Sequence, residues 1–491
     1  MQILLVLLAL TAALIIFMLW RTARFTKKDG EDLPPLDVSD RVPDQEIADH
    51  LAAVIRCATV SNADPEKVDW SEFDRLHRVL EELYPAVHRT MEKEIIGTHN
   101  LLFRWKGSDP DAKPVALLAH QDVVPVGDVS AWKYPPFSGT DDGEVIWGRG
   151  ACDMKNHLVM VMDACERLIN EGYVPERDIY LCFGQNEEVG CVPAMTGADL
   201  IASTLRDRGI TLDLVLDEGG AIVSGDTLGI KQKFAMIGVV EKGFADYRIT
   251  AHEKGGHSAR PPKHTGLGKL GAAAVRLEKA KKPLRLIPPV REMLIRLAPY
   301  MPQFILRFLT ANIDICEGLL LKVLSLSPLM NAMVSTTYAL TQAQGSEQDN
   351  VLPKDAWLGV NSRILPGEDI DGVRKFIEKT VDDPSLEVTV TKAHQVQNIS
   401  PHDTKGFELL TELTGRYYPG TLVAPYQQFG GTDSRNYYIV CDNVYRFMPF
   451  CIGSGDDTLG AHNIDEHMPK DGLGRSVCFM MDFIKEYKGE A

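Results

Sequence analysis

The chain begins with a stretch in which almost every position is apolar. Apart from Thr11, residues 3–20 carry no polar side chain, and as a helix they would reach ~27 Å, close to the thickness of a bilayer's hydrocarbon core. Basic residues follow this stretch and do not precede it, unlike in a signal peptide: Arg21, Arg24, Lys27 and Lys28. The pattern predicts a single-pass membrane anchor over residues 1–28, with flanking charges that favour a cytoplasmic-facing domain. Cleavage of this segment would instead make the protein secreted.

Beyond a charged linker at residues 29–44, short apolar runs alternate with amphipathic helical patterns. Helical patterns begin at Gln45, cover Phe73–Val87, and run from Asp153 through Leu168. The alternation predicts an α/β domain, a mixed and mainly parallel sheet flanked by helices, over residues 45–238 and again over 394–491. Ligands of such sheets bind at the carboxyl ends of the strands. The runs predicted as strands are Asn100–Trp105, Pro114–Ala119, Asp178–Phe183 and Leu212–Leu216.

From about residue 239 the pattern changes, and a second module is predicted over residues 239–393. Its elements follow the order β-α-β-β-α-β, which is typical of a ferredoxin-like α+β module. Residues 283–333 add a helical insertion rich in Leu, Ile, Phe and Met, which prolines break too often for it to span a bilayer. The insertion either packs as a helical hairpin on the module or presents an apolar surface to a lipid-like substrate or the membrane. The predicted strands are Phe244–Thr250, Ser335–Thr341, Ala356–Arg363 and Leu386–Thr391, and the helices are Gly266–Ala280 and Ile370–Val381.

Charge and cysteine usage exclude some classes of protein. The formal net charge is −16, which argues against nucleic acid as a partner, because phosphate binding needs a basic surface. Nine cysteines are scattered along the chain without a C-x-x-C pair. We therefore expect buried free thiols, and neither a disulfide framework nor a structural zinc site.

A glycine-rich turn at Gly148–Lys155 precedes the third helical pattern. Two glycines allow a tight turn, but Asp153 stands where a dinucleotide-binding fingerprint has its third glycine. A carboxylate at that point repels a pyrophosphate and attracts a cation. We therefore expect Asp153 to bridge two metal ions, with further ligands before and after it in the chain.

Such ligands follow the predicted strands. His120 and Asp122 follow one strand, and residues two apart on an extended chain share a face, so Asp122 can orient His120 as a ligand. The adjacent acids Glu187 and Glu188 follow the next strand, where two like charges are costly unless a cation neutralises them. One can ligate metal while Glu187 serves as the general base. Asp217–Glu218 repeats the arrangement, and histidine with carboxylates suits zinc, with manganese or cobalt as alternatives.

Together these motifs resemble the aminoacylase/carboxypeptidase S/glutamate carboxypeptidase family of di-zinc metallopeptidases. The resemblance rests on His120-x-Asp122, Gly148-x-Gly150-x-x-Asp153-x-Lys155, Glu187–Glu188 and the turn Gly256–His257–Ser258. It extends from about Gln45 to the C-terminus. The segment Phe429–Arg435 and the N-terminal apolar stretch are most similar to the carboxypeptidase S and N-fatty-acyl-amino-acid synthase/hydrolase branch.

The resemblance implies a role for each motif. Two Zn²⁺ ions per subunit would be bound, Asp122 would orient His120, and Glu187 would act as base and then acid. A cis peptide bond between Asp153 and Met154 is also implied. His467, close to one ligand in sequence, is interpreted as a surface histidine. The implied ligands are Asp153 as the bridge, His120 with Asp217 at one site, and Glu188 with His462 at the other.

The resemblance also makes the module at residues 239–393 a lid or dimerisation domain, so that a homodimer is expected. His257 would stabilise the substrate oxyanion, often that of the partner subunit, and Asn350 would assist it. Arg363 would bind the terminal carboxylate of the substrate through its planar guanidinium.

The predicted reaction is metal-dependent hydrolysis of an N-acyl amino acid, with a long acyl chain favoured by the apolar insertion and anchor, or of a short peptide at its C-terminal residue. A plain Gly-X carboxypeptidase or dipeptidase is the alternative within this class. A serine hydrolase is suggested by Gly256–His257–Ser258–Ala259–Arg260, although the closing glycine of that motif is missing. A non-catalytic, membrane-tethered binding protein is the alternative of another class.

Overall fold

The computed structural model describes residues 2–27, 33–190, 196–396, 398–452 and 459–490. Part of the predicted linker and Cys191 lie outside these residues. The other eight cysteines are free thiols, as expected from their spacing.

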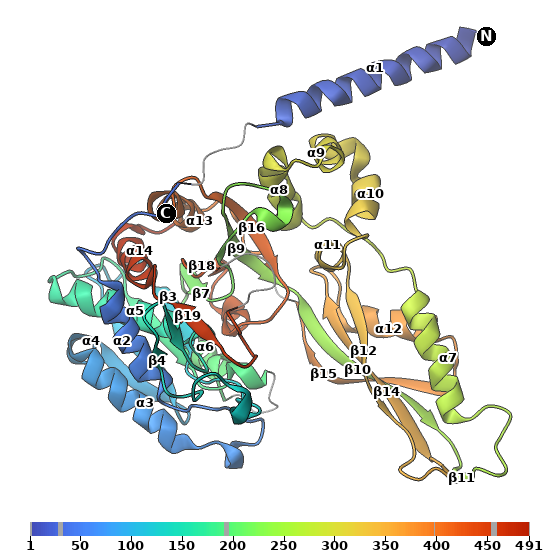
Figure 1. The fold of residues 1–491 in the computed structure, drawn as a ribbon, viewed down its shortest axis with the longest axis horizontal. Coiled ribbons are helices and arrows are strands. Elements are labelled where there is room, and N and C mark those ends of the chain that lie inside the picture. The colour runs from blue at the N-terminus through green and yellow to red at the C-terminus, as the bar shows by residue number, and fades with distance from the viewer. Residues whose placement is uncertain (1, 28–32, 191–195, 397, 453–458, 491) are drawn as a thin grey trace.

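A ten-stranded mixed sheet forms the centre of the larger part of the molecule (Figure 1). Its middle strands are parallel: β3 pairs with β6 and β7, and β7 pairs with β17. The predicted α/β architecture with a mainly parallel sheet is therefore confirmed. In spatial order the strands are β1 (Glu92–Ile96), β2 (Asn100–Trp105), β6 (Ile179–Gly184), β3 (Val115–His120), β7 (Leu214–Asp217), β17 (Val444–Arg446), β9 (Phe234–Glu241), β8 (Ile222–Val223) and β18 (Cys451–Ile452), with β16 (Leu422–Gln428) paired to β9.

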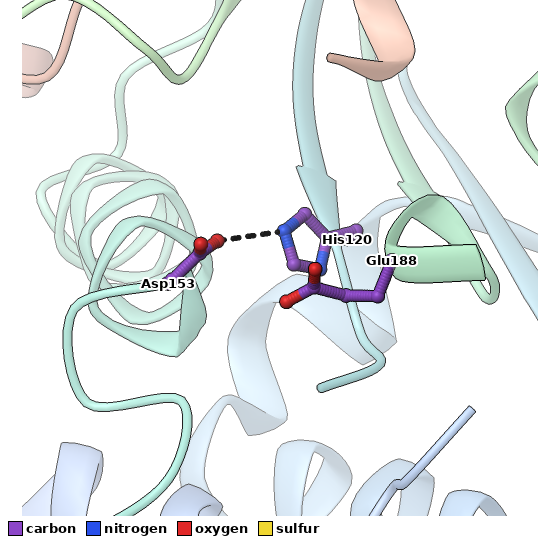
Figure 2. Close-up of side chains that lie close together, drawn as sticks. All are labelled: His120, Asp153 and Glu188. Carbon is purple, nitrogen blue, oxygen red and sulfur yellow. Dashed lines mark hydrogen bonds and ion pairs between the residues drawn. The ribbon is translucent and has the colours of Figure 1, made fainter. Parts of the chain in front are cut away.

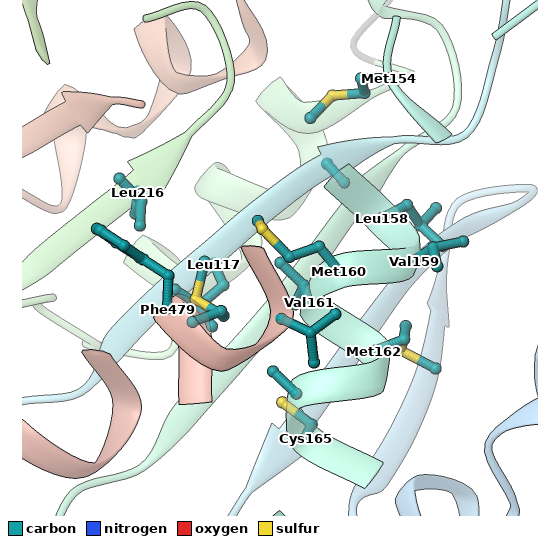
Figure 3. Close-up of a cluster of buried hydrophobic side chains, with 14 of the residues drawn as sticks. Leu117, Met154, Leu158, Val159, Met160, Val161, Met162, Cys165, Leu216 and Phe479 are labelled. Atoms are coloured by element: carbon teal, nitrogen blue, oxygen red, sulfur yellow. The ribbon is translucent and has the colours of Figure 1, made fainter. Parts of the chain in front are cut away.

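Helices cover both faces of this sheet. On one face α5 packs between the sheet and its neighbours α2 and α14, which explains why every residue of α5 from Lys155 to Cys165 is buried. Figure 3 shows Leu158, Met160 and Val161 of α5 against Leu117, Leu216 and Phe479. Burial of each such side chain stabilises the fold by about 1.5–3 kcal/mol. The helices are α2 (Asp44–Ile55), α3 (Trp70–Leu83), α4 (Pro85–Thr90), α5 (Lys155–Asn170), α6 (Ala198–Asp207), α13 (Lys405–Tyr417) and α14 (Leu473–Glu486), and the 3₁₀ helices η3 (Glu187–Val189) and η6 (Asp433–Ile439) lie near the strand ends.

The single helix predicted for Phe73–Val87 is wrong, because Pro85 begins a separate helix, α4. Proline is well suited to the first position of a helix and poorly suited to its interior. The helix predicted to open at Asp153 begins at Lys155 instead, since Met154 has a non-helical φ of −132°. The peptide bond between Asp153 and Met154 is cis, as the resemblance implied.

A separate antiparallel sheet projects from the larger part (Figure 1). Its strand order is β12-β14-β10-β15, and β10 pairs along its whole length with β14, from Gly243 opposite Ile364 to His252 opposite Asp355. Two helices pack on it, and a two-stranded ribbon of β11 and β13 lies at its distal end. The elements are β10 (Gly243–His252), β11 (Gly256–His257), α7 (Gly266–Lys279), β12 (Thr337–Gln344), β13 (Val351–Leu352), β14 (Asp355–Ile364), α12 (Ile370–Val381) and β15 (Leu386–His394).

The helical insertion packs against the larger sheet and not, as one interpretation of its sequence had it, as a hairpin on the smaller module. Val290 and Leu294 share a core with Phe234 of β9 and Ala424 of β16. The reason is that β9 and β16 present an apolar surface, which these helices cover. The insertion contains α8 (Pro288–Leu297), α9 (Phe304–Ala311), α10 (Ile313–Leu324) and α11 (Pro328–Val334).

The N-terminal apolar stretch is a single helix, α1 (Gln2–Phe25). Among the described residues it is the one helix long and apolar enough to cross a membrane, with a mean hydropathy of 2.9 over its best 18 residues. Its C-terminal turns lie beside α9 of the insertion.

Candidate metal centre

The turn at Gly148–Lys155 is held by one buried carboxylate from the far end of the chain. Glu466 Oε1 accepts hydrogen bonds from the backbone N–H groups of Cys152 (3.0 Å) and Asp153 (3.1 Å). Its Oε2 accepts one from the N–H of Gly150 (3.0 Å) and one from the guanidinium of Arg149 (2.6 Å). Gly150 has a φ of +86°, which favours glycine. These contacts fix the backbone that presents Asp153.

Asp153 lies between two histidines. Its Oδ1 lies 3.1 Å from Nε2 of His120, and its Oδ2 lies 3.1 Å from Nε2 of His462. Glu188 Oε2 lies 2.9 Å from the same nitrogen of His462. Figure 2 shows the side chains of His120, Asp153 and Glu188 directed towards a common point. The carboxylate of Asp153 therefore faces one histidine with each oxygen.

Glu218, and not Asp217, is the acid beside His120. Glu218 Oε1 lies 3.5 Å from Nε2 of His120. Asp217 instead accepts a hydrogen bond at Oδ2 from the N–H of Ser434 (2.8 Å), at the start of η6. Residues of a strand alternate between its faces, so Asp217 shares the face of Val215, which packs under η6. Because Glu218 comes after the last residue of β7, its side chain turns towards His120.

Two groups of three side chains bring potential ligand atoms within 4.8 Å of one another in the described part of the chain. One group is His120, Asp153 and Glu188, and the other is His120, Glu187 and Glu218. His120 is common to both groups. The predicted residues Asp153, His120, Glu188, Glu187 and His462 thus lie together, whereas Glu218 takes the place expected for Asp217.

Asp122 supports this cluster in a way that spacing did not reveal. Its buried carboxylate accepts hydrogen bonds from the N–H groups of Glu187 (3.0 Å) and Glu188 (3.1 Å), and so caps η3. Its backbone carbonyl lies 2.9 Å from Nδ1 of His120. A carbonyl only accepts, so Nδ1 carries the proton and Nε2 of a neutral His120 keeps its lone pair for a metal.

Burial and hydrogen bonds shift the pKa values of the acids and histidines in this cluster. Burial raises the pKa of Glu218 to about 8, with the negative charge of Asp153 adding to the effect, and burial also raises the pKa of Glu187 and Glu188. Hydrogen bonds to Asp153 and Glu188 raise the pKa of His462 to about 10. Burial alone would raise the pKa of Asp153, but hydrogen bonds from the two histidines hold it below its ordinary value.

The donor set fits a divalent cation. In the described residues Glu188 Oε1 is buried and lacks a hydrogen-bond partner, which is expensive for a carboxylate unless something compensates it. Imidazole and carboxylate ligands suit zinc and neighbouring divalent metals. These groups must lose their protons in order to ligate a cation.

The cluster forms the polar end of a cavity of about 640 Å³. Glu187 lies at this end, with its Oε1 3.9 Å from the guanidinium of Arg435. The rest of the cavity is apolar and reaches the helical insertion. Its apolar lining includes Phe234 of β9, Met293, Leu294 and Leu297 of α8, and Met330 and Met333 of α11.

Three predicted residues of the smaller module lie apart from the cluster within one chain. His257 lies on β11 opposite Val351, and the carbonyl of Asn350 accepts a hydrogen bond from the N–H of Ser258 (3.0 Å). These residues sit at the distal end of the module, far from β3 and β7 (Figure 1). Arg363 is on β14 near the junction of the two sheets, with its guanidinium 5.7 Å from the ring centre of Phe244.

His467, interpreted from sequence as a surface histidine, is half-buried in β19 (His467–Pro469), with its ring 4.7 Å from that of Trp147. Trp147 belongs to β5 (Val145–Trp147), which forms a small sheet with β4 (Thr140–Asp141) and β19. His467 thus packs against a neighbouring strand, outside both groups of candidate ligands.

Comparison with known proteins decides the family. The sequence profile of peptidase family M20/M25/M40 matches residues 116–486, a range that contains every residue of the cluster. The chain belongs to peptidase family M20/M25/M40. The prediction of a metallopeptidase fold and of a hydrolase acting on peptide or linear amide bonds is thereby confirmed, and the serine-hydrolase and non-catalytic alternatives are set aside.

Relatives in this family extend over almost the whole chain. Probable carboxypeptidase S-like 2 of Dictyostelium discoideum is 30% identical over 97% of this chain and 92% of its own length. The N-fatty-acyl-amino acid synthase/hydrolase PM20D1 of Xenopus tropicalis is 32% identical over 90% of this chain and 86% of its own. Among solved structures, the M20 family metallo-carboxypeptidase Sso-CP2 of Sulfolobus solfataricus has a TM-score of 0.66 at 16% identity, covering 90% of this chain and 98% of that one.

Proposed function

We propose that this chain is a two-metal amidohydrolase for N-acyl amino acids with long, apolar acyl chains. His120, Asp153 and Glu218 would hold one ion, and Asp153, Glu188 and His462 would hold the other. Zn²⁺ fits this donor set, with Mn²⁺ and Co²⁺ as alternatives. Glu218 takes the position that the resemblance gave to Asp217, on the strength of its 3.5 Å approach to His120.

Bound ions would supply Lewis-acid polarisation of the amide carbonyl and would lower the pKa of a water. Glu187 takes the proton of the attacking water and passes it to the nitrogen of the leaving amino acid. Its place supports this role, because it borders the cavity and lies in the group with His120 and Glu218. Burial keeps its pKa high, which suits a group that must hold the proton before releasing it.

The cavity is the observation that carries the choice of substrate. It joins the cluster of acids and histidines to a long apolar space between the larger sheet and the helical insertion. Its volume of about 640 Å³ is within the range of sites for small organic ligands, about 300–1,000 Å³. An acyl chain fits the apolar part of the lining, which suits a hydrocarbon better than the polar backbone of a peptide.

The smaller module acts as a lid and dimerisation domain in this proposal. His257 and Asn350 lie too far from the cluster to serve their own subunit in the arrangement of Figure 1, so a homodimer would place them at the oxyanion of a partner. Arg363, near the junction of the sheets, would bind the carboxylate of the amino acid as a planar, two-pronged donor.

The helix α1 is proposed to anchor the enzyme in a membrane as a single span. It is 24 residues long, and 6% of its most apolar window is buried. Arg21 and Arg24 lie near its C-terminal end. Positive charges on that side of the span favour a catalytic domain on the cytoplasmic side of the membrane. If α1 were instead cleaved as a signal peptide, the enzyme would be secreted and not anchored.

Steady-state hydrolysis of a substrate series tests the proposal. The series contains N-acyl phenylalanines from acetyl to hexadecanoyl, with Gly-Phe as a dipeptide. Each methylene that enters the cavity contributes about 0.8 kcal/mol, so kcat/KM is expected to rise about fourfold per CH₂ until the cavity is full. Met293→Trp, which narrows the cavity, should shorten the preferred chain without reducing turnover of the acetyl substrate.

Two results would refute the proposal. Higher kcat/KM for Gly-Phe than for every acyl amino acid would identify a plain dipeptidase or carboxypeptidase. Activity that survives complete chelation of divalent metals would exclude the two-metal mechanism.

A further inference from the structure

The helical insertion is joined firmly to the last turns of α1. Met18 and Thr22 are the buried residues of α1. The buried amide of Asn312 donates hydrogen bonds to the carbonyl of Met18 (3.2 Å) and the hydroxyl of Thr22 (3.3 Å). The N–H of Lys27 donates to the carbonyl of Pro299 (3.0 Å), beyond the end of α8. These contacts hold the insertion against α1, so the medium that surrounds the C-terminal end of α1 also lies close to the insertion.

The insertion carries an unusual concentration of exposed apolar side chains. Of the seventeen large hydrophobic residues exposed outside α1 in the described part of the chain, six fall between residues 304 and 329. Large exposed apolar surfaces are costly in water and mark sites of interaction. Leu319 is 56% exposed and Leu326 is 83% exposed. This apolar face consists of Phe304, Ile305, Ile315, Leu319, Leu326 and Leu329.

We propose that the side chains of this apolar face insert into the same lipid bilayer that α1 spans. Three observations select lipid as the occupant. The face is continuous with the docked end of α1, whose remaining length is almost entirely unburied. Basic residues lie at this junction, where Arg21 pairs with Asp314 of α10 (3.5 Å) and the ammonium of Lys27 lies 5.6 Å from the ring centre of Tyr300. Cationic side chains are favoured at the level of lipid headgroups. Ile315 and Leu319 are one helical turn apart, so the exposed side of α10 carries an apolar stripe that suits a helix lying along the membrane surface.

The apolar face also meets the cavity. Leu329 is 55% exposed and at the same time lines the cavity that ends at Asp153 and Glu187. The cavity therefore opens on the apolar face. A chain inserted in this way admits its acyl substrate sideways from the bilayer, with no passage through water. This route rests on the proposed substrate and reaction, whereas the contact with lipid rests only on the proposed membrane span of α1.

Fluorescence of the full-length chain in vesicles tests the lipid contact. Single cysteines at Leu319 and Leu326 are labelled with an environment-sensitive nitrobenzoxadiazole dye, and the chain is reconstituted in phosphatidylcholine/phosphatidylglycerol vesicles. Matched controls are cysteines at Val275 on α7 (51% exposed) and Ile95 on β1 (53% exposed). The unsubstituted chain gives the background from native thiols. The expected result is a blue-shifted emission at positions 319 and 326, quenched at least twofold by lipids with a nitroxide on the acyl chain, and neither effect at the controls.

Three results would overturn the proposal. One is emission at positions 319 and 326 that matches the controls. Another is a blue shift without nitroxide quenching, which would show that a second copy of the chain covers the face. The third is a chain that does not float with the vesicles. Hydrolysis of N-acetyl-phenylalanine by the same samples keeps this test separate from the proposed function, because the lipid contact can fail while that activity stays intact.

The entry route has its own test with paired variants. Leu319→Glu and Leu326→Glu place charges on the apolar face without touching the cavity lining. They should lower the turnover of hexadecanoyl-phenylalanine embedded in vesicles at least tenfold and leave that of N-acetyl-phenylalanine within twofold of wild type. Val275→Glu is the control and should change neither. Equal losses on both substrates, or no loss on either, would contradict entry from the bilayer.

Discussion

Glu466 offers the sharpest test of how the fold presents Asp153. Its carboxylate accepts four hydrogen bonds, three from backbone N–H groups of the turn and one from the buried guanidinium of Arg149. The Glu466→Gln side chain keeps its shape, but one carboxylate oxygen becomes an amide NH₂ group, which cannot accept a hydrogen bond. Arg149 also loses the negative charge that it faces. Removing one partner of a buried ion pair costs about 3–5 kcal/mol. At about 2 °C per kcal/mol, the melting temperature should fall by about 6–10 °C.

The assay combines differential scanning fluorimetry with metal analysis of the purified variant. Metal content should fall together with stability, because two of the four donors that hold the turn carrying Asp153 then face an amide NH₂ group. Glu278→Gln is the control, because it removes the same negative charge from an exposed position on α7. A melting temperature within about 2 °C of wild type, with full metal content, would refute the claim that Glu466 holds the turn.

Two other predictions concern the chemistry of the site. Glu187→Gln should lower kcat by about 10²–10⁴-fold, the usual contribution of a general base, while metal content stays at the wild-type level; kcat within tenfold of wild type would remove Glu187 from that role. Zinc affinity of the metal-free protein should rise at least about tenfold per pH unit between pH 6 and 8. The sign follows from the pKa of about 8 for Glu218 and about 10 for His462, because each group must lose its proton before it ligates. A chelator-competition titration with a flat profile would contradict this.

The sequence was most informative where the chemistry is local. His120, Asp153 and Glu188 each follow a strand or a turn that apolar periodicity and glycines identify, and an acid or histidine in such a place needs a partner. The choice between Asp217 and Glu218 was harder, because adjacent acids look alike in sequence. Alternation along the strands does not resolve this choice, because Leu118 and Val215 share one core and so place His120 and Asp217 on the same face. The structure nevertheless brings Glu218, beyond the last residue of β7, to 3.5 Å from His120.

The sequence carries no comparable indication of which distant segments contact each other. Glu466 lies 313 residues after Asp153, and nothing near it in sequence marks it as the acceptor for the turn. The insertion shows the same limit: its apolar pattern predicted buried helical faces, but not that Val290 and Leu294 pack on β9 and β16 of the larger sheet. An amphipathic pattern indicates that a helix has a buried side and does not identify the surface that covers it.

Metal stoichiometry of the purified chain and of three variants tests the central claim most directly. If Asp153 lies between two ions with Glu218 as a ligand of one, inductively coupled plasma mass spectrometry should find about two ions per wild-type chain. It should find almost none in Asp153→Ala, about one in Glu218→Gln, and about two in Asp217→Asn. Two ions retained in Asp153→Ala would contradict the bridging role, and loss of metal in Asp217→Asn but not in Glu218→Gln would return the ligand position to Asp217.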